Sequence, residues 1–197
     1  MDWKTYYKEH TTTAEEAVKL IKSGDRVVIE HACGEPIYLV DKMVENADAY
    51  KDVEIVHMVA MGKGAYCAPE MAEHFHHNSL FVGASTRKAV ESGQGDFTPC
   101  FFFEIPRLFH STLPVALINV TPPDEDGNVS MGVSCDYTAE AVKCAKTVIA
   151  QVNPSMPFTY GATVIPATDI DAFVEHDEPL IELGAPKIGD TERAIGE

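Results

Sequence analysis

The strongest constraint on the fold is an alternation of short β-branched runs with amphipathic segments along most of the chain. The runs predict strands at Arg26–His31, Glu54–Ala60, Ser79–Val82, Val115–Val120, Val129–Val133 and Thr147–Val152. The intervening segments predict helices at Thr13–Ser23, Pro36–Tyr50, Ser85–Ser92 and Thr138–Lys146. Strands that alternate with helices usually pair in parallel, because each helix returns the chain to the same end of the sheet. We therefore predict an α/β fold with an open, mostly parallel sheet flanked by helices.

The charge balance and the cysteines exclude several classes of protein. There are 31 acidic against 15 basic residues, and the net charge of −16 argues against binding to nucleic acid or to anionic membranes. The N-terminus (MDWKTYYKEH) lacks the apolar core of a secretory signal, and prolines interrupt the longest uncharged stretch, Thr147–Thr168. The five cysteines form no Cys-x-x-Cys pair, which favours free thiols in a reducing compartment. We expect a cytoplasmic protein.

The composition changes toward the C-terminal end. We expect an α/β core over residues 1–150, followed by the last strand or strands and an acidic connector over residues 151–189. From residue 151 onward there are nine acidic and two basic residues. Residues 190–197 begin with an acidic cap and first turn typical of a helix start. We expect them to open a helix that leads into a C-terminal domain.

Two polar clusters superficially resemble metal sites. His74 and His77 could share a helix face with His76 nearby, but the pattern is not His-Glu-x-x-His and further ligands are missing. Asp124–Asn128 has its glycine too early for a calcium-binding EF-hand loop. A packing or solvated histidine cluster and a polar turn are the favoured interpretations, and we expect no metal site.

Two glycine-containing loops follow predicted strands, at the edge where α/β sheets bind ligands. They are Cys33–Pro36 and Met61–Gly64. Neither matches a dinucleotide fingerprint or a P-loop, and glycine can also serve a turn that needs positive φ. For the first loop a ligand wall and a plain turn stay equally open, whereas a plain turn is favoured for the second. A nucleophilic Cys33 at the strand end is less favoured than a small buried cysteine.

Several strings together resemble one known family. The most specific runs from Pro122 to Thr138 and reads PPDEDG followed by GVSCDYT. The supporting strings are Met1–Lys4, Thr13–Val18, Ser23–Val27, His57–Val59 with Gly62–Gly64, Ser85–Arg87, Val152–Pro154, Pro157, Tyr160–Gly161 and Leu183–Gly189. Over essentially its whole length, the chain resembles the N-terminal half of the acetyl-CoA hydrolase/transferase family of class I CoA-transferases. Within that family it is most similar to enzymes acting on 4-hydroxybutyryl-CoA and butyryl-CoA.

The resemblance implies that CoA moves between a short-chain acyl-CoA and a carboxylate such as acetate, through a glutamyl-CoA intermediate. The family's nucleophilic glutamate and most of its CoA contacts belong to the C-terminal half. No glutamate in this chain matches the motif of the nucleophile, so we expect no catalytic residue here and no activity of the chain alone. The resemblance implies no cofactor beyond coenzyme A as a substrate, a C-terminal catalytic half as partner, and a homo-oligomer at full length.

The resemblance also implies a substrate pocket lined by loop residues. They are Gly34, Glu35, Pro36, Gly62 and Gly64. Two alternatives remain at this stage. One is a standalone, non-catalytic module that binds acyl-CoA or a partner protein. The other is a sugar-phosphate isomerase, whose phosphate cradle only Gly83–Lys88 approaches.

Overall fold

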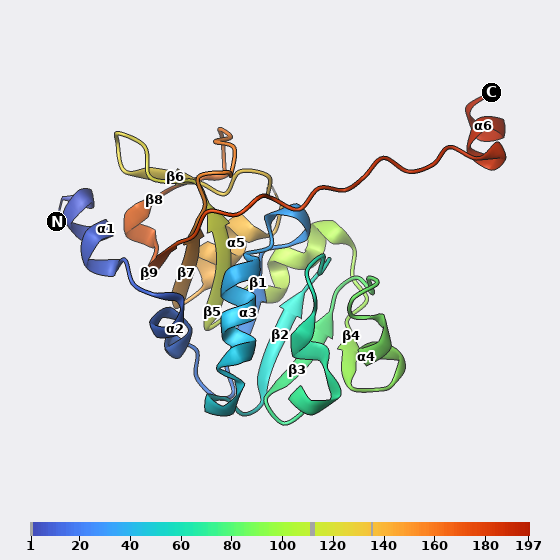
Figure 1. Ribbon diagram of the computed structural model, residues 1–197, viewed down its shortest axis with the longest axis horizontal. Coiled ribbons are helices and arrows are strands. Elements are labelled where there is room, and N and C mark those ends of the chain that lie inside the picture. Colours follow the sequence, from blue (N-terminus) through green and yellow to red (C-terminus); the bar gives the residue numbers. More distant parts are fainter. Residues whose placement is uncertain (1, 111–112, 135) are drawn as a thin grey trace.

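Seven strands of the computed structural model form one sheet in the order β4-β3-β2-β1-β5-β7-β9, and all neighbouring strands in it are parallel (Figure 1). The structure describes residues 2–110, 113–134 and 136–197. The strands of the sheet are β1 (Arg26–Ile29), β2 (Val53–His57), β3 (Phe75–Ser79), β4 (Gly95–Phe97), β5 (Val115–Val120), β7 (Thr147–Val152) and β9 (Ala172–Glu175). The predicted α/β fold with a parallel sheet is confirmed.

Helices and short 3-10 turns connect these strands. The α-helices are α1 (Trp3–His10), α2 (Ala14–Ala17), α3 (Ile37–Glu45), α4 (Arg87–Glu91), α5 (Thr138–Cys144) and α6 (Asp190–Gly196). The 3-10 helices are η1 (Val18–Leu20), η2 (Ala32–Gly34), η3 (Ala47–Ala49), η4 (Ala65–Cys67), η5 (Pro69–Met71), η6 (Phe102–Phe109) and η7 (Ala167–Asp169). A separate antiparallel ribbon pairs β6 (Asn128–Ser130) with β8 (Val164–Pro166). Within the described ranges, no helix is long and apolar enough to span a membrane.

Alternate side chains of the central strands fill two hydrophobic cores, because successive residues of a strand face opposite sides of the sheet. Ile29 belongs to one core together with Leu39 of α3. Its neighbour Val28 belongs to the other core, with Phe109 of η6 and Val142 of α5. Figure 1 shows α3 in front of the sheet and α5 behind it. Both faces of β1 are therefore covered, which is why its sequence is a continuous apolar run.

Strand β1 lies at the centre of the sheet, and the chain leaves it in two directions. Strands β2, β3 and β4 extend the sheet on one side, and β5, β7 and β9 extend it on the other. The loops after β1 and β5 therefore diverge. In open α/β sheets, such a switch of direction leaves a crevice at the carboxyl ends of the strands, where ligands bind.

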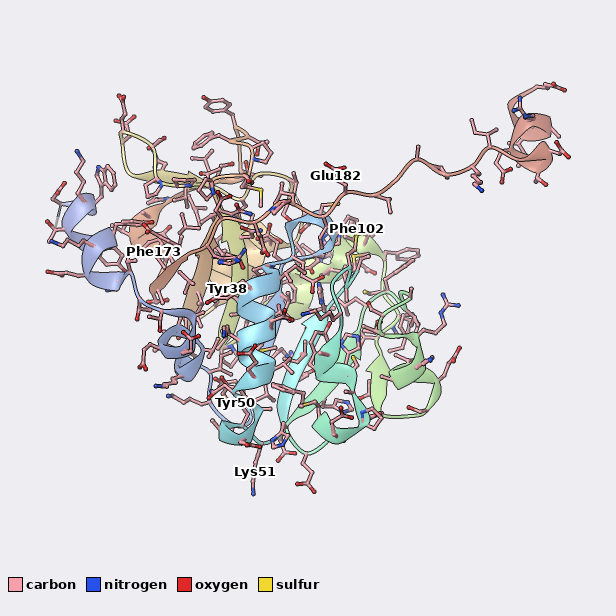
Figure 2. The ribbon with its side chains drawn as sticks, in the orientation of Figure 1. Tyr38, Tyr50, Lys51, Phe102, Phe173 and Glu182 are labelled. Carbon is pink, nitrogen blue, oxygen red and sulfur yellow. The ribbon has the colours of Figure 1, made fainter. Side chains whose placement is uncertain are left out.

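The first helix is fastened to the last strand of the sheet. Thr12 N donates to the Phe173 carbonyl at 2.9 Å, and the Tyr6 hydroxyl donates to the Ile170 carbonyl at 3.0 Å. The Tyr7 ring lies 4.6 Å from the Phe173 ring, centroid to centroid, and its hydroxyl donates to Glu175 (Figure 2). Residues far apart in the sequence thus close one edge of the sheet. After β9 the chain runs away from the sheet to α6 (Figure 1).

The structure agrees with several predicted elements and corrects others. The predicted strands Val115–Val120 and Thr147–Val152 match β5 and β7 residue for residue. The predicted third strand was misplaced, because β3 covers Phe75–Ser79 instead of Ser79–Val82. The helix predicted at Thr13–Ser23 is a short α-helix followed by a 3-10 turn, and the Thr13 side chain caps it as expected. The apolar segment Thr98–Phe103 leads into η6 and exposes three phenylalanines, Phe101, Phe102 and Phe103.

Candidate functional site

Polar side chains gather where β1, β2 and β5 end. Glu30, Glu35, His57, Asn119 and Ser134 are each at most 2% exposed. A buried polar group costs free energy unless it is hydrogen-bonded or meets a ligand. Within the part of the chain that the structure describes, buried atoms without a hydrogen-bond partner include one oxygen of Glu30, Oδ1 of Asn119 and Nε2 of His57. This concentration at the crevice predicted by the strand order marks it as the candidate site.

Glu30 ties the end of β1 to β5. Its Oε2 accepts a hydrogen bond from the Asn119 backbone N–H at 2.8 Å. A side chain at Gly34 would collide with Glu30 Oε1 and with the Ser134 hydroxyl, so only glycine fits there. Burial raises the pKa of Glu30 well above its ordinary value, and the nearby Asn119 N–H and Ser134 hydroxyl offset this only in part. Glu30 is therefore a buried structural acid at the base of the site.

Next to Glu30, His31 forms an ion pair with Asp136. Its Nδ1 lies 2.7 Å from Asp136 Oδ2, and the two side chains are only 15% and 10% exposed. Asp136 Oδ1 also accepts hydrogen bonds from the Thr138 backbone N–H and hydroxyl, each at 3.0 Å. Burial opposes ionisation of Asp136, but His31 and Thr138 outweigh it and hold its pKa below the ordinary value. The carboxylate orients the imidazole and leaves its Nε2 for a ligand.

Aromatic rings enclose His31 on two sides. The Tyr137 ring is stacked against the imidazole, with 5.3 Å between the ring centroids, and the Tyr137 hydroxyl donates to the Ile29 carbonyl. The edge of the Phe102 ring meets the imidazole at 5.9 Å, and Phe102 itself is half exposed (Figure 2). Ala32 directly follows with a φ of 56°, a left-handed conformation that costs a residue with a Cβ about 1 kcal/mol or more. The strained loop and the ring contacts together fix the position of His31.

Glu35 joins the two loops that the sequence singled out. Its Oε2 accepts hydrogen bonds from the backbone N–H groups of Met61 and Gly62, both at 2.8 Å. A Cβ on Gly62 would come within 2.6 Å of both Glu35 Oε1 and Ile37 Cδ1, so the two loops touch. Burial raises the pKa of Glu35, and the two N–H groups counter it. The side chain of Glu35 faces the second loop and has almost no solvent contact.

The other predicted residues lie in the same two loops. Gly34 and Pro36 flank Glu35 and are buried. Gly64 is also buried, adopts a φ of 59° and lies against Ser85. It borders a surface hollow that Lys88 also lines. Of the five residues predicted from the sequence, Gly34, Pro36 and Gly62 thus adjoin Glu35, whereas Gly64 adjoins Ser85.

His57 lies beneath Glu35. Its Nδ1 shares a hydrogen bond of 2.9 Å with the Tyr66 hydroxyl, and its Nε2 lies 3.9 Å from Glu35 Oε2. Burial first, and the neighbouring His77 and His31 next, lower the pKa of His57 well below its ordinary value. The imidazole of His57 is therefore neutral and lies next to Glu35, whose carboxylate connects the two loops.

Four residues of this site, Glu30, His31, His57 and Asp136, are not among those predicted from the sequence. A signal existed for the first two, because an acid and a histidine directly follow the apolar run of β1. In α/β sheets that position is where ligand-binding residues collect. Nothing local links His31 to Asp136, since the pairing depends on how the segment between β6 and α5 packs against the end of β1.

The polar groups of the two clusters considered for metal binding have partners within the protein. His74, His76 and His77 contact Tyr50 O, Asp96 and Ile55 O respectively, and they lie at and within β3, not on a helix. The helix assumed for them was wrong. Asp124 Oδ1 accepts from the backbone N–H groups of Asp126 and Asn128, which closes a turn. Cys33 lies in η2 and is partly exposed.

The chain is similar in sequence to CoA-transferases. A family model for the N-terminal domain of acetyl-CoA hydrolase/transferase matches residues 1–183. A 4-hydroxybutyrate coenzyme A transferase of Clostridium kluyveri is 55% identical over 200 residues, which cover 100% of this chain and 47% of that protein. A butyryl-CoA:acetate CoA-transferase of Anaerostipes caccae is 29% identical and is covered to 43%, against 93% of this chain. The chain spans about half the length of the curated relatives it matches.

Solved structures agree in fold. RipA from Yersinia pestis superposes with a TM-score of 0.91 at 27% identity, over 96% of this chain and 47% of RipA. A 4-hydroxybutyrate CoA-transferase from Porphyromonas gingivalis superposes with a TM-score of 0.79 at 33% identity, over 92% of this chain and 43% of that chain. In each case the similarity covers one part of a longer protein.

Proposed function

This chain belongs to the acetyl-CoA hydrolase/transferase family and corresponds to the N-terminal domain of that family. We therefore propose that it forms the substrate-positioning half of a CoA-transferase. The substrates are a short-chain acyl-CoA, 4-hydroxybutyryl- or butyryl-CoA, and a carboxylate such as acetate. The observation that carries this proposal is the 55% identity across the whole chain to a 4-hydroxybutyrate coenzyme A transferase. The site at the ends of β1 and β2 supports it.

His31 is the residue that meets the substrate. Asp136 engages its Nδ1 at 2.7 Å, so the protonated imidazole of His31 donates from Nε2 to a carboxylate or thioester oxygen. The exposed Phe102 ring beside it offers an apolar wall for a short acyl chain. Glu35 and Gly62 hold the two loops together, and Gly34 lets the first loop lie against Glu30 and Ser134. Pro36 starts α3, and Gly64 shapes the neighbouring surface.

The covalent chemistry uses a glutamate outside this chain, in the half of the relatives that the chain does not cover. That carboxylate attacks the thioester carbonyl and expels CoA as a thiolate, which leaves a mixed anhydride. The thiolate then attacks the glutamyl carbonyl, releases the first carboxylate and forms the glutamyl-CoA thioester. The acceptor carboxylate repeats these steps in reverse. Backbone or side-chain donors must stabilise each oxyanion, because a carboxylate is a weak nucleophile.

Three further properties belong to this proposal. Coenzyme A is a substrate, and no metal or redox cofactor takes part in the transfer. The whole protein is a cytoplasmic homo-oligomer that contains the C-terminal catalytic half. It binds neither nucleic acid nor membrane, in keeping with its net charge of −16.

A chimera tests the proposal. Residues 1–197 replace the matching segment of the Clostridium kluyveri transferase, and acetyl-CoA formed from 4-hydroxybutyryl-CoA and acetate is followed by chromatography. We expect the chimera to transfer CoA and the isolated chain to be inactive. His31→Gln in the chimera should lower kcat/KM roughly 100-fold, the scale of one lost transition-state donor. His76→Gln is the matched control, because His76 is an exposed histidine paired with Asp96.

Two results would overturn the proposal. A folded, soluble chimera without transferase activity would remove the assignment to this reaction. Turnover by the isolated chain would place the nucleophile within residues 1–197, and borohydride reduction of the glutamyl-CoA thioester followed by mass spectrometry would then locate the reduced glutamate.

A further inference from the structure

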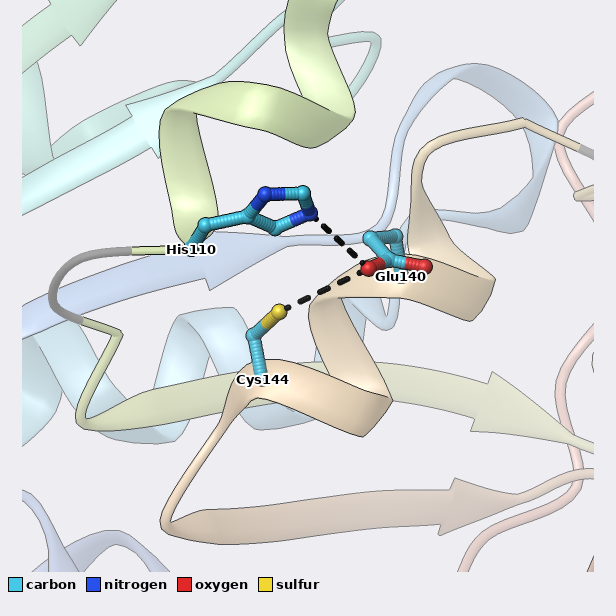
Figure 3. A group of neighbouring side chains, drawn as sticks. All are labelled: His110, Glu140 and Cys144. Carbon is cyan, nitrogen blue, oxygen red and sulfur yellow. Dashed lines mark hydrogen bonds and ion pairs between the residues drawn. The ribbon is translucent and has the colours of Figure 1, made fainter.

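Three side chains of metal-binding type converge behind the sheet, away from the His31 pair. His110 follows the last residue of η6, and Glu140 and Cys144 stand one turn apart on α5 (Figure 3). His110 Nε2 lies 3.1 Å from Glu140 Oε1, and Cys144 Sγ lies 3.8 Å from the same oxygen. All three donor atoms lie within 4.8 Å of one another. This group is the His110 cluster.

The positions of the three residues follow from packing and helix geometry. Residues four apart on a helix lie on the same face, so Glu140 and Cys144 present their donors side by side. Buried residues of η6 and α5, including Phe109 and Val142, belong to one hydrophobic core. The two elements therefore hold the His110 cluster together without help from a metal.

The separations are close to those of a tetrahedral site. Bonds of zinc to nitrogen, oxygen and sulfur measure roughly 2.0–2.3 Å, so the ligand atoms of a tetrahedral site lie about 3.3–3.7 Å apart. The distances from Glu140 Oε1 to His110 Nε2 (3.1 Å) and to Cys144 Sγ (3.8 Å) lie just outside that range on either side. The His110 and Cys144 donors lie within 4.8 Å of each other, so side-chain rotations must adjust all three separations when an ion binds. His110 is 58% exposed and Glu140 30% exposed, so an ion can enter and water can supply the fourth ligand.

The donor set selects the kind of metal. An imidazole and a thiolate favour zinc and similar transition ions, whereas magnesium and calcium require mostly oxygen ligands. The number of donors also distinguishes this cluster from another pair in the chain. His76 and Asp96 form a similar exposed pair at 2.8 Å, but they belong to no group of three donors among the described residues.

We propose that His110, Glu140 and Cys144 form a Zn²⁺ site that clamps η6 onto α5. Binding converts the Cys144 thiol to a zinc thiolate and releases one proton to solvent, with no change of oxidation state. Lys143 lies 3.6 Å from the second oxygen of Glu140 and swings away when the ion neutralises that carboxylate. Since η6 begins at Phe102, beside His31, the clamp would also stiffen the aromatic wall of the candidate site. The proposal does not depend on the transferase reaction.

The test measures metal binding by the reduced chain itself. Co²⁺ is titrated first, because a cobalt thiolate gives a near-ultraviolet charge-transfer band, and Zn²⁺ is then used to displace it. We expect one equivalent of Zn²⁺ to bind and abolish the cobalt spectrum, while Mg²⁺ and Ca²⁺ do not. Cys144→Ser and His110→Gln should each weaken Zn²⁺ binding at least 10-fold in calorimetry. The controls Cys100→Ser and His76→Gln should leave the affinity unchanged.

A second measurement needs no variant. Iodoacetamide labelling of the unaltered chain is mapped by peptide mass spectrometry with and without Zn²⁺. We expect zinc to protect Cys144 selectively, while Cys33 and Cys100 stay as reactive as before. The proposal fails if the chain binds no stoichiometric Zn²⁺, if binding survives both cluster variants, or if zinc leaves Cys144 unprotected.

Discussion

Replacing Asp136 by asparagine isolates the electrostatic contribution of the His31 pair. The Asp136 carboxylate meets His31 Nδ1 at 2.7 Å and accepts two hydrogen bonds from Thr138, each at 3.0 Å. The asparagine side chain has almost the same shape and keeps one oxygen for Thr138. What Asp136→Asn removes is the negative charge that faces His31.

The expected loss of stability follows from these contacts. Removing one charge of a partly buried ion pair costs more than the roughly 0.2–1 kcal/mol that an exposed pair contributes. The Asp136 side chain is only 10% exposed, so solvent screens the interaction little. We therefore expect Asp136→Asn to lower the free energy of unfolding by about 1–2 kcal/mol at pH 7, a change that urea denaturation followed by circular dichroism resolves.

The difference should depend on pH with a definite sign. The folded-state pKa of Asp136 lies below its ordinary value of 3.8, so the unfolded chain takes up the proton first on acidification. The stabilisation by Asp136 is complete above that ordinary pKa and disappears as the pH falls through the folded-state pKa. The difference in stability between the unaltered chain and Asp136→Asn should thus begin to shrink below about pH 5 and continue to shrink as the pH falls below 3.8.

A matched control separates this effect from general loss of charge. Asp190→Asn removes one charge from an exposed residue of α6 and should shift stability by less than about 0.5 kcal/mol. The reasoning is refuted if Asp136→Asn is as stable as the unaltered chain at pH 7. It is equally refuted if the difference stays constant down to pH 3, because the lost energy would then be steric and not ionic.

Three further predictions use the same denaturation assay. Tyr137→Phe should cost about 1–2 kcal/mol, because it leaves the buried Ile29 carbonyl without its donor; an unchanged midpoint would contradict this. The raised pKa of Glu30 means that the folded chain holds a proton more tightly than the unfolded chain, so stability falls as the pH rises through the folded-state pKa. Glu30→Gln should remove that fall, and parallel profiles from pH 5 to pH 8 would argue against it. Gly34→Ala should cost about 1–3 kcal/mol through its collision with Glu30, whereas Gly184→Ala, which meets open space, should change little; equal effects would discount the collision.

The parts of the fold that the sequence predicts well are those where burial alone decides the pattern. Strands β5 and β7 lie inside a sheet that is covered on both faces, so most of their residues are apolar and the ends of these runs are visible in the sequence. Strand β3 is not recognisable as an apolar run because it contains two histidines and an asparagine. Their polar groups are satisfied by neighbours such as the Ile55 carbonyl and Glu54, which only the folded sheet supplies.

The location of the candidate site is likewise predictable from the sequence, whereas the contacts within it are not. Its location follows from strand order, and the first loop can be located from the sequence because Gly34 and Glu35 follow a recognisable strand. The partners of those residues are not predictable locally. Glu35 reaches the loop after β2, and His31 reaches Asp136 in a segment that lies far along the chain. Both pairings depend on register and packing across the sheet.

The fastening of α1 to β9 has a consequence for synthesis. Tyr6 and its hydrogen-bond partner Ile170 are 164 residues apart in the chain. At a translation rate of roughly 5–20 residues per second, the first helix waits about 8–33 s before its partner is made. Throughout that interval the apolar side of α1 has no native surface to cover. Helix α1 is thus synthesised well before β9 but docks only after β9 has been made.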